Sequence, residues 1–127
     1  VRLLSFTSTL DAGKAVNPQQ VEGQAHGGLA QAIGWALTEK FVQEGGMVKT
    51  PDFTTYLLPT VQDVPQNMRI FLVETPDEHG PYGARGIGEL PMLAAAPAIL
   101  AAIHNATGAW VNHVPARAED VWHAMHG

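Results

Sequence analysis

Hydrophobic residues in the segment 24–41 recur at every fourth position. They are Leu29, Ile33, Leu37 and Phe41. This spacing predicts an amphipathic helix over residues 24–41 that stops before Gly45-Gly46. Gly23, Gly27 and Gly34 share another face of the same helix. Because a helical glycine costs roughly 1 kcal/mol relative to alanine, we expect this face either to pack tightly on a neighbouring strand or to be approached closely by a ligand.

Two more helices are expected in the second half of the chain. Residues 91–105 are rich in alanine, and Pro91 suits a first helical position. Pro97 lies inside this run and implies a kink or a second helix start. Residues 116–125 predict a short closing helix, with Glu119 and Asp120 favourably placed near the positive end of its dipole.

Strand-like runs separate these helices. Residues 1–10 and 68–75 are rich in branched apolar and aromatic side chains, and residues 47–50 form a shorter run of the same kind. The run 68–75 is apolar on both faces, which predicts a strand internal to a sheet. Residues 52–65 and 76–90 contain proline and glycine breaks and predict loops. The pattern therefore predicts an α+β fold, with a small mixed sheet and about three helices in a single domain, residues 1–127.

Composition narrows the class of protein. The chain has 127 residues, of which 46% are apolar and 15% charged, so we expect one globular domain that buries roughly two-thirds of its extended surface. A net charge of -5 and the lack of any Lys/Arg run argue against a nucleic-acid partner. The longest apolar run, Leu93 to Ile103, is shorter than the roughly 20 residues that cross a bilayer, so we expect a soluble protein without a membrane partner. The absence of cysteine leaves the compartment open but fits a cytoplasmic location, which we expect.

The chain contains no cysteine, which excludes disulfides, a thiol nucleophile and iron–sulfur ligation by its own residues. The six histidines are scattered and show no metal-ligand spacing, so no metal bound by side chains is expected. The sequence also lacks the Rossmann, Walker and GxSxG motifs. It begins with Val1, already in a strand-like run and without an initiator methionine, so we expect a fragment of a longer protein.

The segment Pro81 to Pro91, PYGARGIGELP, carries the main candidate for chemistry. Gly86 and Gly88 permit close contact between the backbone and a bound group. Glu89 follows them, just before a predicted helix and in a loop after a strand, where functional residues are common. Burial there would suit it to act as a general base. The alternative is that Glu89 caps the helix.

Two other polar residues are candidates. Gln24 is expected at a helix start, where free backbone N–H groups bind anions and an amide side chain can both donate and accept. A capping or surface role is the alternative. Arg85 is a cation close in sequence to Glu89 and could keep that carboxylate ionised or orient an anionic substrate, or it could be a surface arginine.

Four sequence blocks occur in a fixed order. They are Asp11-Ala-Gly13 with Asn17-Pro18; Gly23-Gln-Ala-His-Gly-Gly28 with Gln31-Ala-Ile-Gly34 and Glu39; Tyr56-Leu-Leu-Pro59 with Asp63-Val-Pro65; and Gly83-Ala-Arg-Gly-Ile-Gly-Glu89 with Pro91. Together they resemble the C-terminal part of the molybdenum-binding subunit of the xanthine dehydrogenase/aldehyde oxidase family of molybdenum hydroxylases. The resemblance spans nearly the whole chain. Arg85 stands where the family usually has lysine, and Leu90 where it commonly has proline.

The resemblance implies an oxidoreductase that oxidises a purine, an N-heterocycle or an aldehyde with water-derived oxygen. It implies that Glu89 is the catalytic base, which takes a proton from the hydroxyl nucleophile. It further implies that Gln24 contacts the pterin cofactor, that the glycines at 23, 27, 86 and 88 allow the close approach, and that Arg85 lies near the substrate. Xanthine or another purine is the first expected substrate, because Pro-Tyr-Gly-Ala before a basic residue resembles bacterial xanthine dehydrogenases.

The implied cofactor is molybdenum–molybdopterin, in its plain or cytosine dinucleotide form, held largely by segments outside these residues. The implied partners are the rest of the molybdenum-binding subunit and iron–sulfur and FAD domains or subunits. The chain is therefore expected to be a C-terminal subdomain that is inactive alone. Two alternatives from other classes are a non-catalytic packing or assembly module and a stand-alone small-molecule binding domain.

Overall fold

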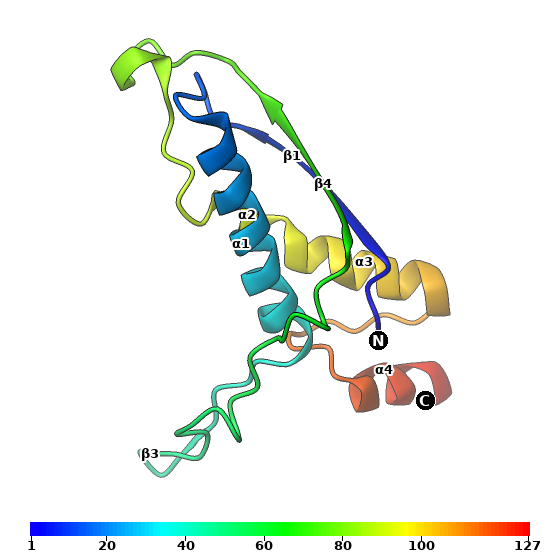
Figure 1. Cartoon of the computed structure of the whole chain (residues 1–127). Helices are drawn as coiled ribbons and strands as arrows, with labels where there is room; N and C mark the ends of the chain where they lie inside the picture. Colours follow the sequence, from blue (N-terminus) through cyan, green and yellow to red (C-terminus); the bar gives the residue numbers. More distant parts are fainter.

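The computed structural model describes all 127 residues and is shown in Figure 1. The elements follow the chain in this order: β1 (Ser5–Asp11), α1 (Pro18–Leu37), β2 (Gln43–Glu44), β3 (Met47–Val48), β4 (Asn67–Val73), the 3-10 turn η1 (Pro81–Gly83), α2 (Leu90–Leu93), α3 (Ala95–Thr107) and α4 (Ala118–His126). The predicted α+β class is confirmed. The predicted closing helix is also present, two residues later than expected at its start.

The strands form two separate pairs. β1 and β4 run parallel, from Ser5 opposite Asn67 to Asp11 opposite Val73. β2 and β3 form a short antiparallel hairpin around Gly45 and Gly46, on an arm that projects from the body in Figure 1. The prediction that residues 68–75 lie inside a sheet is wrong, because β4 pairs with β1 alone and its side chains alternate between half-buried and exposed.

Helix α1 begins six residues earlier than predicted. Asn17 caps it, accepting a hydrogen bond from the backbone N–H of Gln20 at 3.1 Å, and Pro18 takes a first-turn position where its missing N–H is not needed. The helix ends at Leu37, where the N–H groups of Thr38 and Glu39 both donate to the carbonyl of Gly34. Phe41 therefore lies outside the helix and is exposed.

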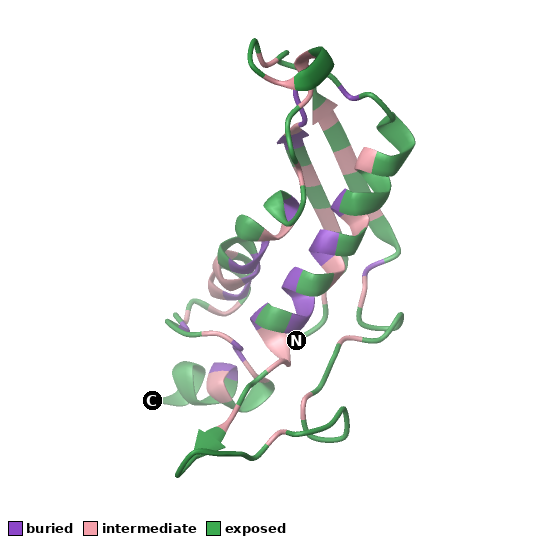
Figure 2. Ribbon diagram, turned by 90° about the vertical axis from the view of Figure 1, so that its left-hand side faces the viewer, coloured by how far each residue is buried: buried purple, intermediate pink, exposed green.

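The core lies between α1, α3 and the inner face of the strand pair. Figure 2 shows the buried residues gathered along one side of α1, with the other side exposed. The buried members from the two helices are Ala25, Leu29, Ala32, Ile33 and Ala36 of α1 and Ala95, Ala96, Ile99 and Ile103 of α3. Small alanines at most of these positions let the helix backbones approach closely.

The predicted helix 91–105 is two helices, α2 and α3, which separate at Ala94. Pro97 is in the first turn of α3, so the predicted second start is confirmed, and a proline there interrupts no helical hydrogen bond. By length and apolar composition alone, the stretch Leu90–Thr107 could cross a membrane, and it is longer than the apolar run expected from the sequence. Core helices of globular proteins can be equally long and apolar, and α3 contributes to this core.

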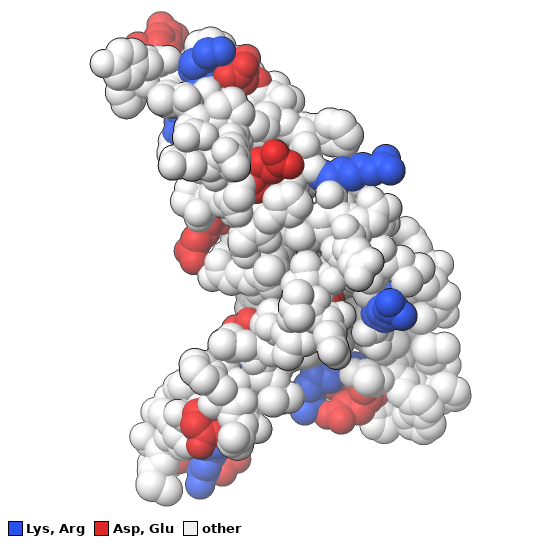
Figure 3. Space-filling view, viewed as in Figure 1, with Lys and Arg blue, Asp and Glu red and all other residues white.

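The molecule is more open than its size predicts. Its accessible surface is 8429 Å², against roughly 6,600 Å² for a compact monomer of this mass. Folding thus buries about 57% of the extended-chain surface rather than the expected two-thirds. Large apolar side chains remain exposed on the arm and elsewhere, among them Phe41, Met47, Phe53, Leu57, Leu93, Trp110 and Trp122. In Figure 3 the charged side chains form small scattered groups with wide uncharged areas between them.

Replacing two glycines of α1 by alanine should change the free energy of unfolding in opposite directions. A Cβ at Gly34 would lie 2.6 Å from Pro59 Cδ and would also collide with the Glu39 side chain, whereas a Cβ at Gly23 would meet no atom within 4 Å. We expect Gly34→Ala to lower the free energy of unfolding by about 1–3 kcal/mol, and Gly23→Ala to raise it by up to about 1 kcal/mol. Urea denaturation measures both, and equal shifts in the two variants would contradict the packing at Gly34.

Candidate functional site

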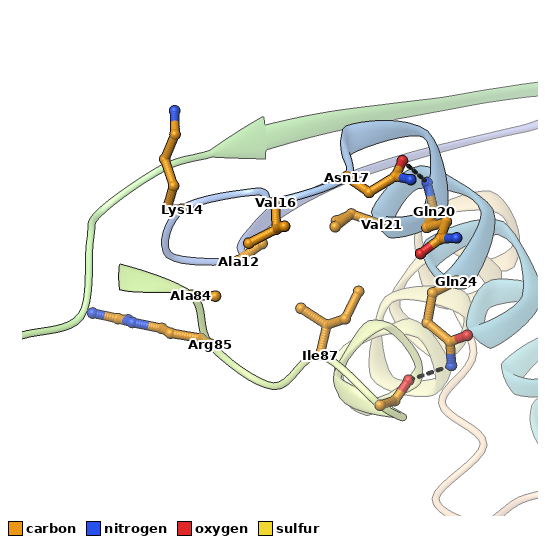
Figure 4. A pocket seen from close by; sticks show the side chains of 11 residues that line it. Ala12, Lys14, Val16, Asn17, Gln20, Val21, Gln24, Ala84, Arg85 and Ile87 are labelled. Carbon is orange, nitrogen blue, oxygen red and sulfur yellow. Dashed lines mark hydrogen bonds between the residues drawn. The ribbon is translucent and has the colours of Figure 1, made fainter. Parts of the chain in front are cut away.

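A cavity of about 500 Å³ lies beside the N-terminal half of α1 (Figure 4). Its lining residues come from three segments that are far apart in the sequence. They are Ala12, Lys14, Val16, Asn17, Gln20, Val21, Gln24, Ala84, Arg85, Ile87 and Gly88. The cavity therefore joins the first, second and fourth of the blocks that carry the family resemblance.

Backbone hydrogen bonds hold two walls of this cavity together. The N–H of Lys14 donates to the carbonyl of Gly83 at 2.7 Å, and the N–H of Arg85 donates to the carbonyl of Ala12 at 2.9 Å. Gly13 lies between these bonds with a φ of 63°, and a side chain there would run into the Gly83 carbonyl. Only glycine adopts this backbone conformation at so close an approach without strain.

Asp11 joins the end of β1 to the loop that follows β4. Its Oδ1 accepts hydrogen bonds from the backbone N–H groups of Gly13 at 2.9 Å and Thr75 at 3.1 Å. These bonds, first that from Thr75 and then that from Gly13, hold the pKa of the Asp11 carboxyl group below its usual value of 3.8, with a smaller contribution from the Arg85 guanidinium. The carboxylate thus fixes the turn that positions the first block.

Arg85 lines the cavity, but it does not pair with Glu89 as expected from the sequence. Its guanidinium lies 3.4 Å from Asp11 Oδ2 and 3.5 Å from Asp77 Oδ2, and these are its two ion pairs. Asp11 ends β1 and Asp77 lies in the loop after β4, so both carboxylates are near the guanidinium at the end of the strand pair. They hold Arg85 at the cavity wall by opposite charge.

Gln24 lies inside α1 rather than at its start, so the prediction that free helix N-terminal N–H groups surround it is wrong. Asn17 caps the helix, which therefore starts at Pro18, six residues before Gln24. The side chain of Gln24 is exposed, and its Nε2 donates to the carbonyl of Gly88 at 2.7 Å (Figure 4). This bond ties the glycine-rich segment of the fourth block to the helix of the second.

Glu89 occupies the N-cap position of α2, but its side chain makes no capping hydrogen bond. Instead its Oε1 accepts a hydrogen bond from Nε2 of Gln31 at 2.9 Å. The residue is exposed rather than buried as a base was expected to be, because the face of α1 that it meets carries no covering segment of this chain. Glu89 thus faces the open side of α1, next to the cavity wall formed by Gly88.

Gln31 is a polar residue of the site that the sequence patterns did not single out. The available signal was its spacing: it follows Gln24 by seven residues, about two turns, and therefore shares its helix face. That both amides meet one loop depends on the fold, since the bonded residues are 64 and 58 positions apart.

The glycines divide into two groups. A Cβ at Gly23, Gly27, Gly86 or Gly88 would meet no atom within 4 Å, so these four positions border open space. At Gly28 and Gly34, by contrast, a Cβ would press against Pro91 and Pro59. Tight packing explains Gly34, although its neighbours Glu39 and Pro59 belong to loops rather than to the strand expected. Gly23 and Gly27 form an open face, for which close approach of a ligand stays a prediction. Such a face has the room that a bulky planar cofactor needs to lie against a helix backbone.

No three His, Asp or Glu side chains come together in a way that could hold a metal ion.

A family model described as the molybdopterin cofactor-binding domain matches residues 1–65, just over half of the chain. The chain belongs to the molybdopterin cofactor-binding domain family.

Similar proteins extend this match to almost the whole chain. A probable xanthine dehydrogenase subunit of Bacillus subtilis (strain 168) is 35% identical over 98% of the chain. Quinoline 2-oxidoreductase from Pseudomonas putida 86 superposes with a TM-score of 0.90 at 36% identity over 98% of the chain. Aldehyde oxidoreductase from Desulfovibrio desulfuricans ATCC 27774 gives a TM-score of 0.86 at 41% identity over 94% of it.

The chain spans only a small part of each of these proteins, 17%, 16% and 13% of their lengths in the same order. The family match and the similar proteins confirm the resemblance to the xanthine dehydrogenase/aldehyde oxidase family that the four sequence blocks indicated.

The lowered pKa of Asp11 predicts acid sensitivity of the cavity wall. Ionised Asp11 stabilises the folded state at pH values above its usual pKa of 3.8, and this contribution disappears as the pH falls through the lower folded-state value. We therefore expect Asp11→Asn to lower the free energy of unfolding at pH 7, and the difference from the unsubstituted chain to shrink below about pH 4. Urea denaturation between pH 3 and 7 measures it.

A suitable control is Glu78→Gln in the loop after β4, because the Glu78 side chain makes no hydrogen bond or ion pair that would change with its charge. A difference for Asp11→Asn that stays constant from pH 7 to pH 3 would show that the carboxylate charge does not hold this turn.

Proposed function

We propose that this chain is part of a molybdopterin-dependent hydroxylase, to which it contributes the catalytic base Glu89 and part of the cofactor-binding surface. The observation that carries the proposal is the pair of hydrogen bonds from Gln24 to Gly88 and from Gln31 to Glu89. They bring the glycine–glutamate motif against the open face of α1, beside the cavity. Membership of the cofactor-binding family supports the assignment.

The residues present fit a bulky cofactor. Gly23 and Gly27 each weaken α1 by roughly 1 kcal/mol, and no packing inside the chain explains them. We assign cofactor contact to Gln24 and to the open glycines at 23, 27, 86 and 88. When bound, the cofactor would supply the Lewis-acid and redox chemistry of molybdenum. The proposal covers the plain pterin and its cytosine dinucleotide form alike.

Glu89 has the chemistry of a proton acceptor. One carboxylate oxygen is engaged by Gln31, and the other makes no hydrogen bond and can take a proton from the hydroxyl nucleophile. The proposed reaction is hydroxylation of an electron-poor carbon with water-derived oxygen. We also assign Arg85, which lines the cavity and pairs with Asp11 and Asp77, to the neighbourhood of the substrate.

The substrate class in the proposal is a purine, an N-heterocycle or an aldehyde, with a purine first. Similar proteins are named for xanthine, quinoline and aldehyde, so the shared segment is compatible with all three classes. Arg85 and Leu90 distinguish the motif of this chain from the usual lysine and proline, and Leu90 is 42% exposed beside Glu89, where it can form part of a pocket wall.

The exposed apolar side chains support packing against further polypeptide. We propose the rest of a molybdenum-binding subunit as that partner, with iron–sulfur and flavin domains or subunits beyond it. The same surface favours the second candidate, a packing or assembly module without catalytic residues. The two candidates differ in what they require of Glu89.

Replacing the proposed base tests the first candidate. In the assembled enzyme, Glu89→Gln keeps the size of the side chain and an oxygen that can accept from Gln31, but a neutral amide does not take up the proton. We expect hydroxylase activity to fall by about 10²–10⁴-fold with the molybdenum content unchanged. Steady-state kinetics and metal analysis provide the two measurements.

Glu22→Gln is the matched control, because Glu22 is an exposed glutamate of α1 that pairs only with His26. It should retain normal activity. If Glu89→Gln were equally active, the base assignment would be wrong and the packing module would remain.

Filling the open glycine face tests cofactor contact. Gly27→Leu places a bulky side chain where a Cβ meets no other atom of the chain, so the fold should tolerate it. We expect the molybdenum content of the assembled enzyme to drop several-fold, since the side chain occupies the space needed by the cofactor. His26→Leu adds the same side chain one residue earlier, on another helix face, and should load normally. Full loading of Gly27→Leu would refute the contact.

A further inference from the structure

The proposed reaction gives Gln31 no chemical role, yet the Glu89 carboxylate accepts a hydrogen bond from the Gln31 side chain. It is the only hydrogen bond of the Glu89 carboxylate, which has no ion-pair partner. We propose that Gln31 is the positioning residue for Glu89 and holds its carboxylate in the orientation needed for proton transfer. This inference rests on the proposed function of Glu89 as the base.

The loop that carries Glu89 does not orient its side chain. Gly86 and Gly88 precede it, and neither position has a neighbour within reach of a Cβ. The helix that follows, α2, is four residues long, and Glu89 does not cap it. An exposed glutamate side chain samples several rotamers in solvent. Without a partner, the carboxylate would therefore point in the productive direction for only part of the time.

Helix α1 provides the rigid support that the loop lacks. Gln31 directly precedes Ala32 and Ile33, which are buried in the core. About two turns earlier on the same face, Gln24 holds the carbonyl of Gly88. The two amides thus fix the backbone and the side chain of the same short segment from one helix.

A neutral amide suits this task. Its N–H group donates to one carboxylate oxygen and leaves the other free to accept a proton. A lysine or arginine at position 31 would hold the carboxylate with a full positive charge and weaken it as a proton acceptor. Geometry matters because a misplacement of about 1 Å at a catalytic group can reduce the rate by about 10²-fold.

The test is Gln31→Met in the assembled enzyme, since methionine matches the length of glutamine and lacks the donor. We expect kcat to fall by about 10- to 100-fold, with KM and molybdenum content unchanged. Gln19→Met is the control, because Gln19 is exposed on α1, makes no side-chain hydrogen bond and lies outside the cavity wall. A wild-type kcat in Gln31→Met, or a loss of activity that follows a loss of molybdenum, would overturn the inference.

A double variant separates positioning from a general structural effect. If Gln31 acts only through the Glu89 carboxylate, Gln31→Met should cause no further loss of kcat in the Glu89→Gln background. If the double variant instead loses the product of the two single fold-changes in kcat, the two residues act independently and the inference is overturned. Full activity of Glu89→Gln would overturn the proposed function and this inference together. An inactive Glu89→Gln with a wild-type Gln31→Met would overturn the positioning role alone.

Discussion

The close approach of Pro91 to Gly28 is the contact on which the site depends. A Cβ on Gly28 would lie 3.0 Å from Pro91 Cβ, so any side chain there would require Pro91 and the start of α2 to shift away from α1. This contact brings the residues just before Pro91 to the helix surface. Gly88 then reaches Gln24, and Glu89 reaches Gln31. A larger residue at position 28 would push the motif away from both amides.

Carboxylates organise the opposite side of the cavity. Asp11 accepts from the N–H groups of Gly13 and Thr75, and Glu74 accepts from the N–H of Ala15 at 2.7 Å. Backbone N–H groups in tight turns need such partners when no strand or helix supplies them. The remaining negative charge is balanced by Arg85 and Lys14. The acidic residues near the strand ends therefore have a structural role that keeps the first and fourth blocks side by side.

The exposed apolar side chains and the open glycines of α1 both belong to surfaces that no other part of this chain covers. The chain leaves one face of α1 lined with glutamine and glycine, and it leaves many large apolar side chains in contact with solvent. Each feature weakens a domain that stands alone, since helical glycines and exposed apolar area both reduce stability. Each becomes favourable when another surface covers it, which is how a cofactor and further polypeptide enter the proposed function.

Local patterns in the chain were enough to predict the elements and the residue types at the site. Periodicity of 3.6 or 2 residues, glycine and proline breaks and the four ordered blocks are local properties, so the helices, the main strands and the family could be predicted from them. The roles of Glu89 and Gln24 stay predictions. Helix bounds failed where a side-chain cap set them, as at Asn17. The pairing of polar groups, in contrast, followed from the three-dimensional packing. Arg85 pairs with Asp11, 74 positions away, and Glu89 with Gln31, 58 positions away, because those partners depend on which loops the packing of α1 against α2, α3 and β4 brings together.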